Sequence, residues 1–107
     1  MDALHNESVE RLFRVIMSLE SIEECHDFFS DVCTVKEVLD MAQRLDTAFM
    51  LDAGTSYQQI TSEIGISAAT IGRVSRCLNY GSGGYRLAID KEKGKEKVPW
   101  YKRILPW

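Results

Sequence analysis

The sequence predicts an all-α domain, and three observations lead to that prediction. Apolar residues recur at the three- and four-residue spacing of amphipathic helices through most of the 107 residues. No segment shows the strict apolar–polar alternation of a half-buried strand. Neither Gly nor Pro occurs before Gly54, so nothing in the first half strongly breaks a helix. The length fits one domain with a modest core, which dimerisation would enlarge.

Two amphipathic helices are expected in the first third of the chain. The first lies within residues 6–20, where Asn6 or Ser8 is available as the N-cap. The second begins at Ser21 and Glu24, which have the spacing of a capping box. The two apolar stripes consist of Val9, Leu12, Phe13, Ile16 and Leu19, and of Ile22, Cys25, Phe28, Phe29 and Val32.

A longer helix is expected from Val35 to Ala53. Thr34 and Glu37 form a second capping box at its start, and Gly54 is placed to be the left-handed residue after its end. Apolar residues cover most of the surface of this helix, which predicts a central, buried position. They are Val35, Val38, Leu39, Met41, Ala42, Leu45, Ala48, Phe49, Met50 and Leu51.

A helix-turn-helix is predicted over about residues 57–76. Ser56 and Gln59 form a capping box that can open a short helix, Gly65 can end it with positive φ, and Ser67 can cap the next helix. A generic helical hairpin is the alternative, but the short first helix and the apolar residue directly after Gly65 favour the specific motif. The apolar positions on its inner side are Ile60, Ile64, Ile66, Ile71, Val74 and Leu78.

The character of the chain changes after Gly81, where Gly81-Ser82-Gly83-Gly84 forms a flexible joint. A short helix is expected around Tyr85 to Ile89, so that a helical domain spans residues 1–90. Residues 91–107 form a basic, aromatic tail whose charged first half we expect to be solvated. This tail has three interpretations: a disordered end, a segment docked on the acidic half of the chain, or a contact with DNA or a membrane.

Charge is divided unevenly along the chain. The net charge is −3, but residues 1–54 hold twelve acidic and four basic residues, whereas residues 55–107 hold four acidic and nine basic ones. This asymmetry indicates an acidic half and a half that can approach phosphate.

The cysteines and histidines offer no metal or disulfide framework. Cys25, Cys33 and Cys77 are an odd, scattered set among apolar neighbours, which predicts buried free thiols in a reducing compartment. His5 and His26 share no metal-ligand spacing with them. With no signal-peptide pattern and no membrane-spanning apolar run, a cytoplasmic protein without membrane contact is expected.

The stretch SYQQITSEIGISAATIGRVSRCLNYGSGGY resembles the tryptophan repressor superfamily, in particular its YerC/YecD branch. The preceding CTVKEVLDMAQRLDTAFMLDAG fits the long helix before the motif in that branch. The resemblance covers about residues 31–85 well and the N-terminal helices loosely. It implies a Trp-repressor-like helical bundle, an intertwined homodimer and a sequence-specific repressor of transcription that binds double-stranded DNA.

The resemblance and the residue types together indicate a DNA-binding surface. The N-terminal end of the recognition helix would enter the major groove, with Gln58 from the preceding helix beside it. Gly72 lies inside the helix at a cost of about 1 kcal/mol relative to Ala, which indicates close approach to DNA, a mobile helix or relief of crowding. The candidate DNA-binding residues are Gln58, Ser67, Ala68, Ala69, Thr70, Gly72, Arg73 and Arg76, the two arginines on phosphate.

The resemblance also implies a corepressor pocket in which an indole lies between two guanidinium planes. Thr70 and Arg73 match two of its residues, but the position of the second arginine falls on Gln43. Arg44 is one residue away, a turn of about 100° on a helix, and Thr34 is an off-register match for a pocket threonine. We therefore expect L-tryptophan to bind weakly or not at all, and no other cofactor.

Two other classes of function compete with a DNA-binding regulator. An enzyme is not expected, because no nucleophile–base pair, metal cluster or phosphate loop is present. A helical protein–protein adaptor with a degenerate helix-turn-helix is the stronger alternative, and the acidic N-terminal half favours it slightly. Retention on DNA that falls with salt distinguishes the two, because phosphate contacts release counterions.

Overall fold

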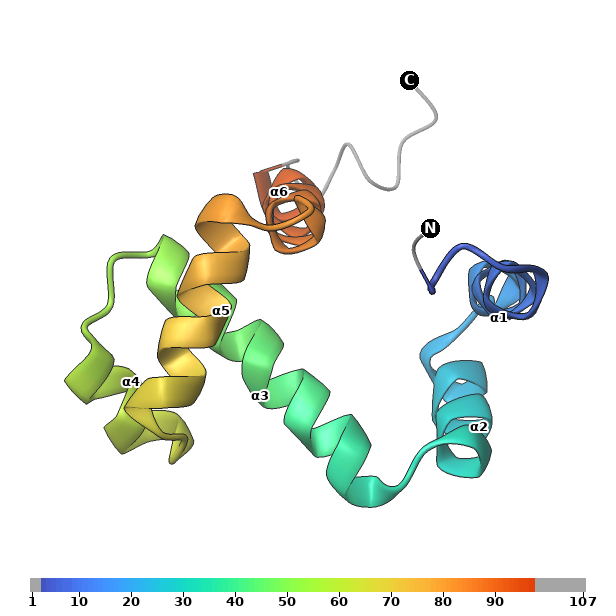
Figure 1. The fold of residues 1–107 in the computed structure, drawn as a ribbon, viewed down its shortest axis with the longest axis horizontal. Helices are drawn as coiled ribbons and strands as arrows, with labels where there is room; N and C mark the ends of the chain where they lie inside the picture. Colours follow the sequence, from blue (N-terminus) through green and yellow to red (C-terminus); the bar gives the residue numbers. More distant parts are fainter. Residues whose placement is uncertain (1–2, 98–107) are drawn as a thin grey trace. The chain divides into compact units, whose positions relative to one another are not determined.

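The computed structural model describes residues 3–97, and its regular structure over those residues is entirely α-helical, as predicted (Figure 1). No helix in this range is long and apolar enough to cross a membrane. The chain divides into two compact units, residues 1–39 and 40–107. The helices are α1 (Glu7–Ser18), α2 (Ile22–Val32), α3 (Val35–Asp52), α4 (Tyr57–Ile64), α5 (Ala68–Tyr80) and α6 (Gly84–Lys97).

The first unit contains α1, α2 and the start of α3, and each helix begins at a predicted cap. Asn6, rather than Ser8, caps α1 by accepting the backbone N–H of Val9 at 3.0 Å. The Ser21 hydroxyl accepts the backbone N–H of Glu24 at 3.0 Å. At the start of α3 the capping box is complete: Thr34 and Glu37 each accept the other's backbone N–H, at 3.1 and 2.8 Å.

The apolar stripes of this unit are left largely uncovered. No residue of α1 or α2 is buried, and the exposed fractions of Met17, Ile22 and Val35 are 84%, 73% and 78%. The prediction of a buried third helix is wrong for a single chain, since only Thr47 and Ala48 of α3 are fully buried. The apolar surface is there as predicted, but one copy of the chain does not supply enough neighbours to cover it.

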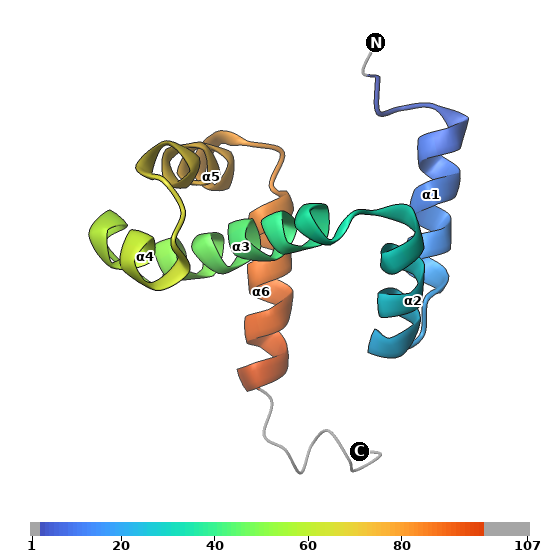
Figure 2. The same cartoon turned by 90° about the horizontal axis from the view of Figure 1, so that it is seen from below.

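The second unit has a small core built by four helices. Helix α5 contacts both α4 and α6 (Figures 1 and 2). Ala48 of α3, Val74 of α5 and Ile89 of α6 form one buried cluster. Gly54 follows α3 with a φ of 84°, as predicted.

Two further expectations need correction. The short helix expected around Tyr85 to Ile89 is longer than predicted: α6 runs to Lys97 and includes the charged run, of which Lys91, Glu92 and Gly94 are exposed, as expected of solvated residues. Ion pairs from Arg86 to Asp90 within the helix, and from Arg86 and Lys93 to Asp52 on α3, hold it in place.

The cysteines also differ from expectation. All three are free, as predicted, but none is buried: Cys25 and Cys33 are half-buried and Cys77 is exposed. The weak coverage of α1 and α2 accounts for the first two. The interpretations of the tail from residue 98 onward concern residues outside those the structure describes.

Candidate nucleic-acid interface

The turn between α4 and α5 has the predicted geometry. The Ser56 hydroxyl caps α4 by accepting the backbone N–H of Gln59 at 3.2 Å. Gly65 ends α4 in the left-handed region at φ 82°, where its lack of Cβ removes the steric penalty. Two residues later the Ser67 hydroxyl caps α5 by accepting the backbone N–H of Thr70 at 3.2 Å. The short helix, glycine turn and second helix of a helix-turn-helix are therefore all present.

One side chain at this turn acts differently from prediction. The amide of Gln59 does not close a capping box but donates to the Glu63 carboxylate at 3.1 Å, one turn further along α4. This leaves the start of α4 with a single side-chain cap.

The inner side of the motif is apolar and buried. Ile60 of α4 and Ile71 of α5 are fully buried, and Val74 is nearly so. Ile64, Ile66 and Leu78 are half-buried around them. Packing on this side fixes which face of α5 remains outside.

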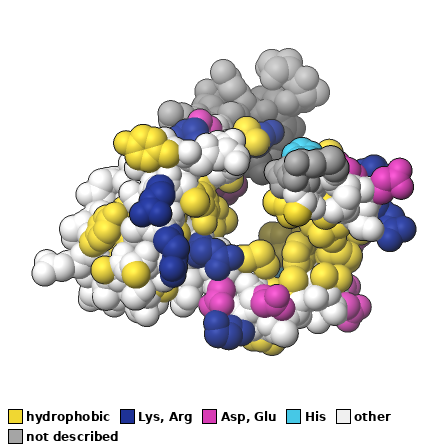
Figure 3. Space-filling model, in the orientation of Figure 1, with side chains coloured by type: hydrophobic (Ala, Val, Ile, Leu, Met, Phe, Trp, Pro, Cys, Tyr) yellow, Lys and Arg dark blue, Asp and Glu magenta, His cyan; other side chains and the backbone are white. Residues whose placement is uncertain are grey.

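The outer face of α5 carries small residues and two arginines. We call Ala68, Ala69, Gly72, Arg73 and Arg76 the outer face of α5; all are exposed except the half-buried Gly72. Figure 3 shows basic side chains in dark blue along this part of the molecule. Within the described part of the chain, neither arginine of this face forms an ion pair with a carboxylate. Their charge is therefore free to meet an anion outside the chain.

A short chain of polar contacts precedes the arginines. The hydroxyls of Ser67 and Thr70 lie 3.1 Å apart, and Arg73 Nη2 donates to Thr70 Oγ1 at 3.4 Å. These contacts hold Arg73 near the N-terminal end of α5. Gln58 is exposed in the first turn of α4.

Gly72 has no packing reason to be glycine within the described part of the chain. A Cβ built on it would meet no heavy atom within 4 Å. Relief of crowding, one of the interpretations of this residue, is therefore not supported by the packing of the described residues.

Of the residues considered for a corepressor pocket, Thr70 and Arg73 are the pair joined by a hydrogen bond in the described part of the chain. Arg44 is an exposed residue of α3. Gln43 is half-buried, and its backbone carbonyl accepts the Thr47 hydroxyl at 2.7 Å. Thr34 belongs to the first unit, where its hydroxyl caps α3. Among the described residues, no His, Cys, Asp or Glu side chains group as metal ligands.

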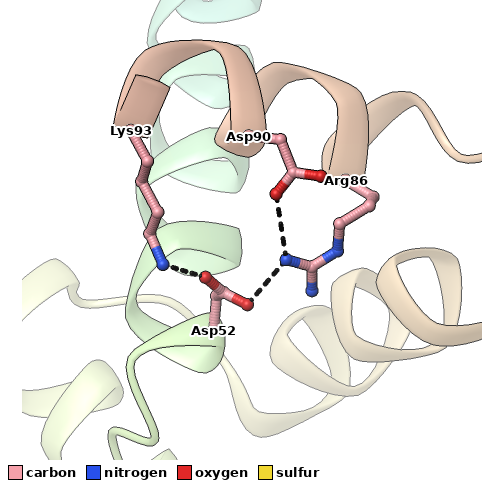
Figure 4. Close-up of polar contacts among 4 residues, drawn as sticks. All are labelled: Asp52, Arg86, Asp90 and Lys93. Carbon is pink, nitrogen blue, oxygen red and sulfur yellow. Dashed lines mark hydrogen bonds and ion pairs between the residues drawn. The ribbon is translucent and has the colours of Figure 1, made fainter. Parts of the chain in front are cut away.

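Sequence reasoning missed Asp52, the last residue of α3, which binds two cations of α6 (Figure 4). Hydrogen bonds from Lys93 and Arg86 hold the pKa of its carboxyl below the ordinary value. A signal was present in the sequence: an acidic residue at a helix C-terminus is disfavoured by the helix dipole and needs a cation.

Comparison with known proteins gives one consistent family. The family model of the Trp repressor protein matches residues 7–93. The uncharacterized protein YerC of Bacillus subtilis (strain 168) is 47% identical over 96 residues, covering 90% of this chain and 92% of YerC.

Two solved structures share the fold. A TrpR-like protein from Eubacterium eligens ATCC 27750 has a TM-score of 0.82 at 43% identity, over 84% of this chain and 93% of that chain. A candidate Trp repressor from Staphylococcus aureus has a TM-score of 0.80 at 41% identity, over 84% and 90%. The similarity therefore extends over nearly the whole described part of the chain.

Proposed function

Since this chain belongs to the Trp repressor protein family, we propose that it is a cytoplasmic, sequence-specific DNA-binding regulator that represses transcription. The observation that carries the proposal is the outer face of α5. Small residues occupy its N-terminal end, and the exposed Arg73 and Arg76 have no carboxylate partner among the described residues. No enzymatic role is proposed.

The recognition helix α5 would enter the major groove with its first turn toward the base edges. Ala68, Ala69 and the methyl group of Thr70 suit thymine methyl groups, and the Gln58 amide suits a base edge or a phosphate. Arg73 and Arg76 would contact phosphates beside the groove. Few hydrogen bonds to bases are available from such small side chains, so DNA shape would contribute to sequence preference.

We propose further that the active form is a homodimer joined through α1, α2 and the first half of α3. The apolar surface left open there supports this. In Figure 3 apolar side chains are exposed over the first unit, and a groove of about 330 Å³ lies between α2 and the start of α3. Ile22, Phe29 and Leu39 are among the apolar residues that line it. A soluble monomer rarely leaves so much contiguous apolar surface open.

Light scattering tests the dimer. A stable, folded monomer at micromolar concentration would contradict it. A second copy bound to this surface would also present two helix-turn-helix motifs to one duplex, which is how such motifs reach useful affinity.

Retention of a mixed-sequence DNA duplex, measured as salt is raised, tests DNA binding. We expect retention to fall steeply with salt, because each phosphate contact releases counterions. Selection of bound duplexes from a randomised pool should then enrich one sequence. Absence of retention at low salt would favour the adaptor with a degenerate motif.

A further inference from the structure

Asp52 joins α3 to α6 through both of its carboxylate oxygens (Figure 4). Arg86 Nη1 lies 2.8 Å from Asp52 Oδ1, and Lys93 Nζ binds Asp52 Oδ2. The two cations are two turns apart on α6, so they lie on the same face of that helix. Arg86 Nη1 also lies 3.6 Å from Asp90 Oδ1, which orients it within α6. The carboxylate is only 13% exposed, whereas Arg86 and Lys93 are 45% and 41% exposed.

Nothing in α3 itself favours a carboxylate at this position. Asp52 is the C-terminal residue of α3, whose last turn contains no basic residue. The helix dipole opposes a negative charge there. The stabilisation of Asp52 therefore comes from α6, and α6 in turn is held against α3 at this point.

Helix α6 supports the recognition helix from the inside. Ile89, which lies between Arg86 and Lys93 in the sequence, is fully buried against Val74 of α5 and Ala48 of α3. Tyr85 of α6 and Leu78 of α5 pack around the same cluster. The position of α6 thus determines the surface on which the C-terminal half of α5 rests.

We propose that Asp52 is a positioning residue for DNA reading: by binding Arg86 and Lys93 it fixes α6 on α3, and α6 then fixes α5. The inference rests on the proposed DNA-binding function. Asp52 itself is not assigned a contact with DNA.

The direction of the change in DNA affinity distinguishes a positioning role of Asp52 from a simple effect of its negative charge. Removing a carboxylate from a protein that binds a polyanion should strengthen binding, or leave it unchanged, through the long-range field. Loss of a positioning carboxylate should weaken binding instead. Asp46 provides the matched control, because it is an exposed aspartate of the same helix.

Amide hydrogen exchange of the full chain tests the structural step without DNA. In Asp52→Asn, amides in the C-terminal half of α5 should exchange about tenfold faster than in the parent, the scale of losing a hydrogen bond to a charged group. Amides of α1 and α2 should not change. In Asp46→Asn, exchange in α5 should match the parent. Equal exchange in α5 of Asp52→Asn and the parent would overturn the proposal.

A milder pair of variants covers the case in which Asp52→Asn folds poorly. Lys93→Gln removes one of the two cations, and Lys91→Gln removes the same charge from an exposed position on α6. Faster exchange in α5 is expected for Lys93→Gln alone. The same exchange in both variants would contradict the role given to Asp52.

DNA binding supplies the functional readout, with a mixed-sequence duplex and the duplex enriched by selection as probes. At a temperature where circular dichroism shows full folding, Asp52→Asn should bind the selected duplex about tenfold more weakly and the mixed-sequence duplex no more weakly than the parent. Asp46→Asn should bind both at least as well as the parent. An equal loss on both duplexes would indicate a merely structural role and overturn the proposal. If the parent binds neither duplex, the proposed DNA-binding function is wrong, and so is the role of Asp52 in DNA reading. The amide hydrogen exchange rates of α5 would still show whether Asp52 orders that helix.

Discussion

Replacing Gly72 with Ala should stabilise the protein and weaken its binding to DNA. Gly72 lies inside α5, where glycine is about 1 kcal/mol less favourable than alanine. The added Cβ would meet no heavy atom within 4 Å among the described residues, so no clash reduces that gain. For a chain of about this length, 1 kcal/mol raises Tm by roughly 4–8 °C. Protein concentration must be held fixed, because association would also shift Tm.

The added methyl group should also weaken the binding of DNA. It would stand on the outer face of α5, one turn after Ala68 and one turn before Arg76, where the proposed function places the duplex. Tight packing at such an interface does not readily accept an added carbon, and overpacking costs about 1–3 kcal/mol. We therefore expect binding to a selected duplex to weaken about tenfold, the equivalent of about 1.4 kcal/mol.

Gly94→Ala is the matched control for this experiment. Gly94 also lies inside a helix, and its Cβ would also meet nothing within 4 Å. It should raise Tm, by less because it is near the end of α6, and leave DNA affinity unchanged. Thermal melts and fluorescence anisotropy measure the two quantities. If Gly72→Ala is more stable than the parent yet binds DNA equally well, close approach to DNA is not the reason for glycine. If it is less stable, the helical conformation described for α5 is wrong.

Four further predictions concern other residues of the chain. Arg73→Ala and Arg76→Ala should each reduce the salt dependence of DNA binding by about one unit of slope, and unchanged slopes in a salt titration would remove these residues from the interface. Gly65→Val should lower Tm, since a β-branched residue at φ 82° is strained; a melt at the parental Tm would contradict the turn described. Hydrogen bonds from Lys93 and Arg86 lower the pKa of Asp52 from 3.8, so its stabilising effect is present above about pH 4 and lost as pH falls through the lowered pKa. Urea titrations should therefore show that the parent loses more stability than Asp52→Asn between about pH 5 and pH 3. L-Tryptophan should give no calorimetric signal at micromolar concentrations, because the family resemblance places Gln43 at the position of the second arginine that would enclose an indole; micromolar affinity would contradict this prediction.

Local signals predicted the fold well where a residue's role depends on its immediate neighbours. Ser21, Thr34 and Ser67 cap the helices predicted for them, and Asn6 is the one of two candidates that caps α1, because capping is decided within three residues of the chain. Gly65 takes positive φ for the same local reason. The order of the helices followed from the same local signals, and the family resemblance added the kind of helical bundle.

The sequence was less informative where distant residues decide the outcome. The helix expected to end near Ile89 continues to Lys97, and within this extension Lys93 binds an aspartate 41 residues away, a contact that local composition does not indicate. Val35 lies in an apolar stripe yet is 78% exposed. The stripe indicates which face of the helix is apolar, but not which other helix or molecule packs against that face. The residues proposed to contact DNA are exposed as expected, but their exposure does not test the contact.

The small core connects two of the proposals, dimerisation and DNA binding. Among the side chains described, the buried apolar ones are Ala48, Ile60, Ile71, Val74 and Ile89. All five lie in the second unit, and burial of each larger side chain contributes only about 1.5–3 kcal/mol. The first unit has no comparable core, so its helices depend on whatever covers their apolar stripes. If a second copy covers them, ordering of α3 and dimerisation are one event. Because α3 also carries Ala48 and Asp52, which support α5 through the buried cluster and α6, the recognition helix would then be best ordered in the dimer.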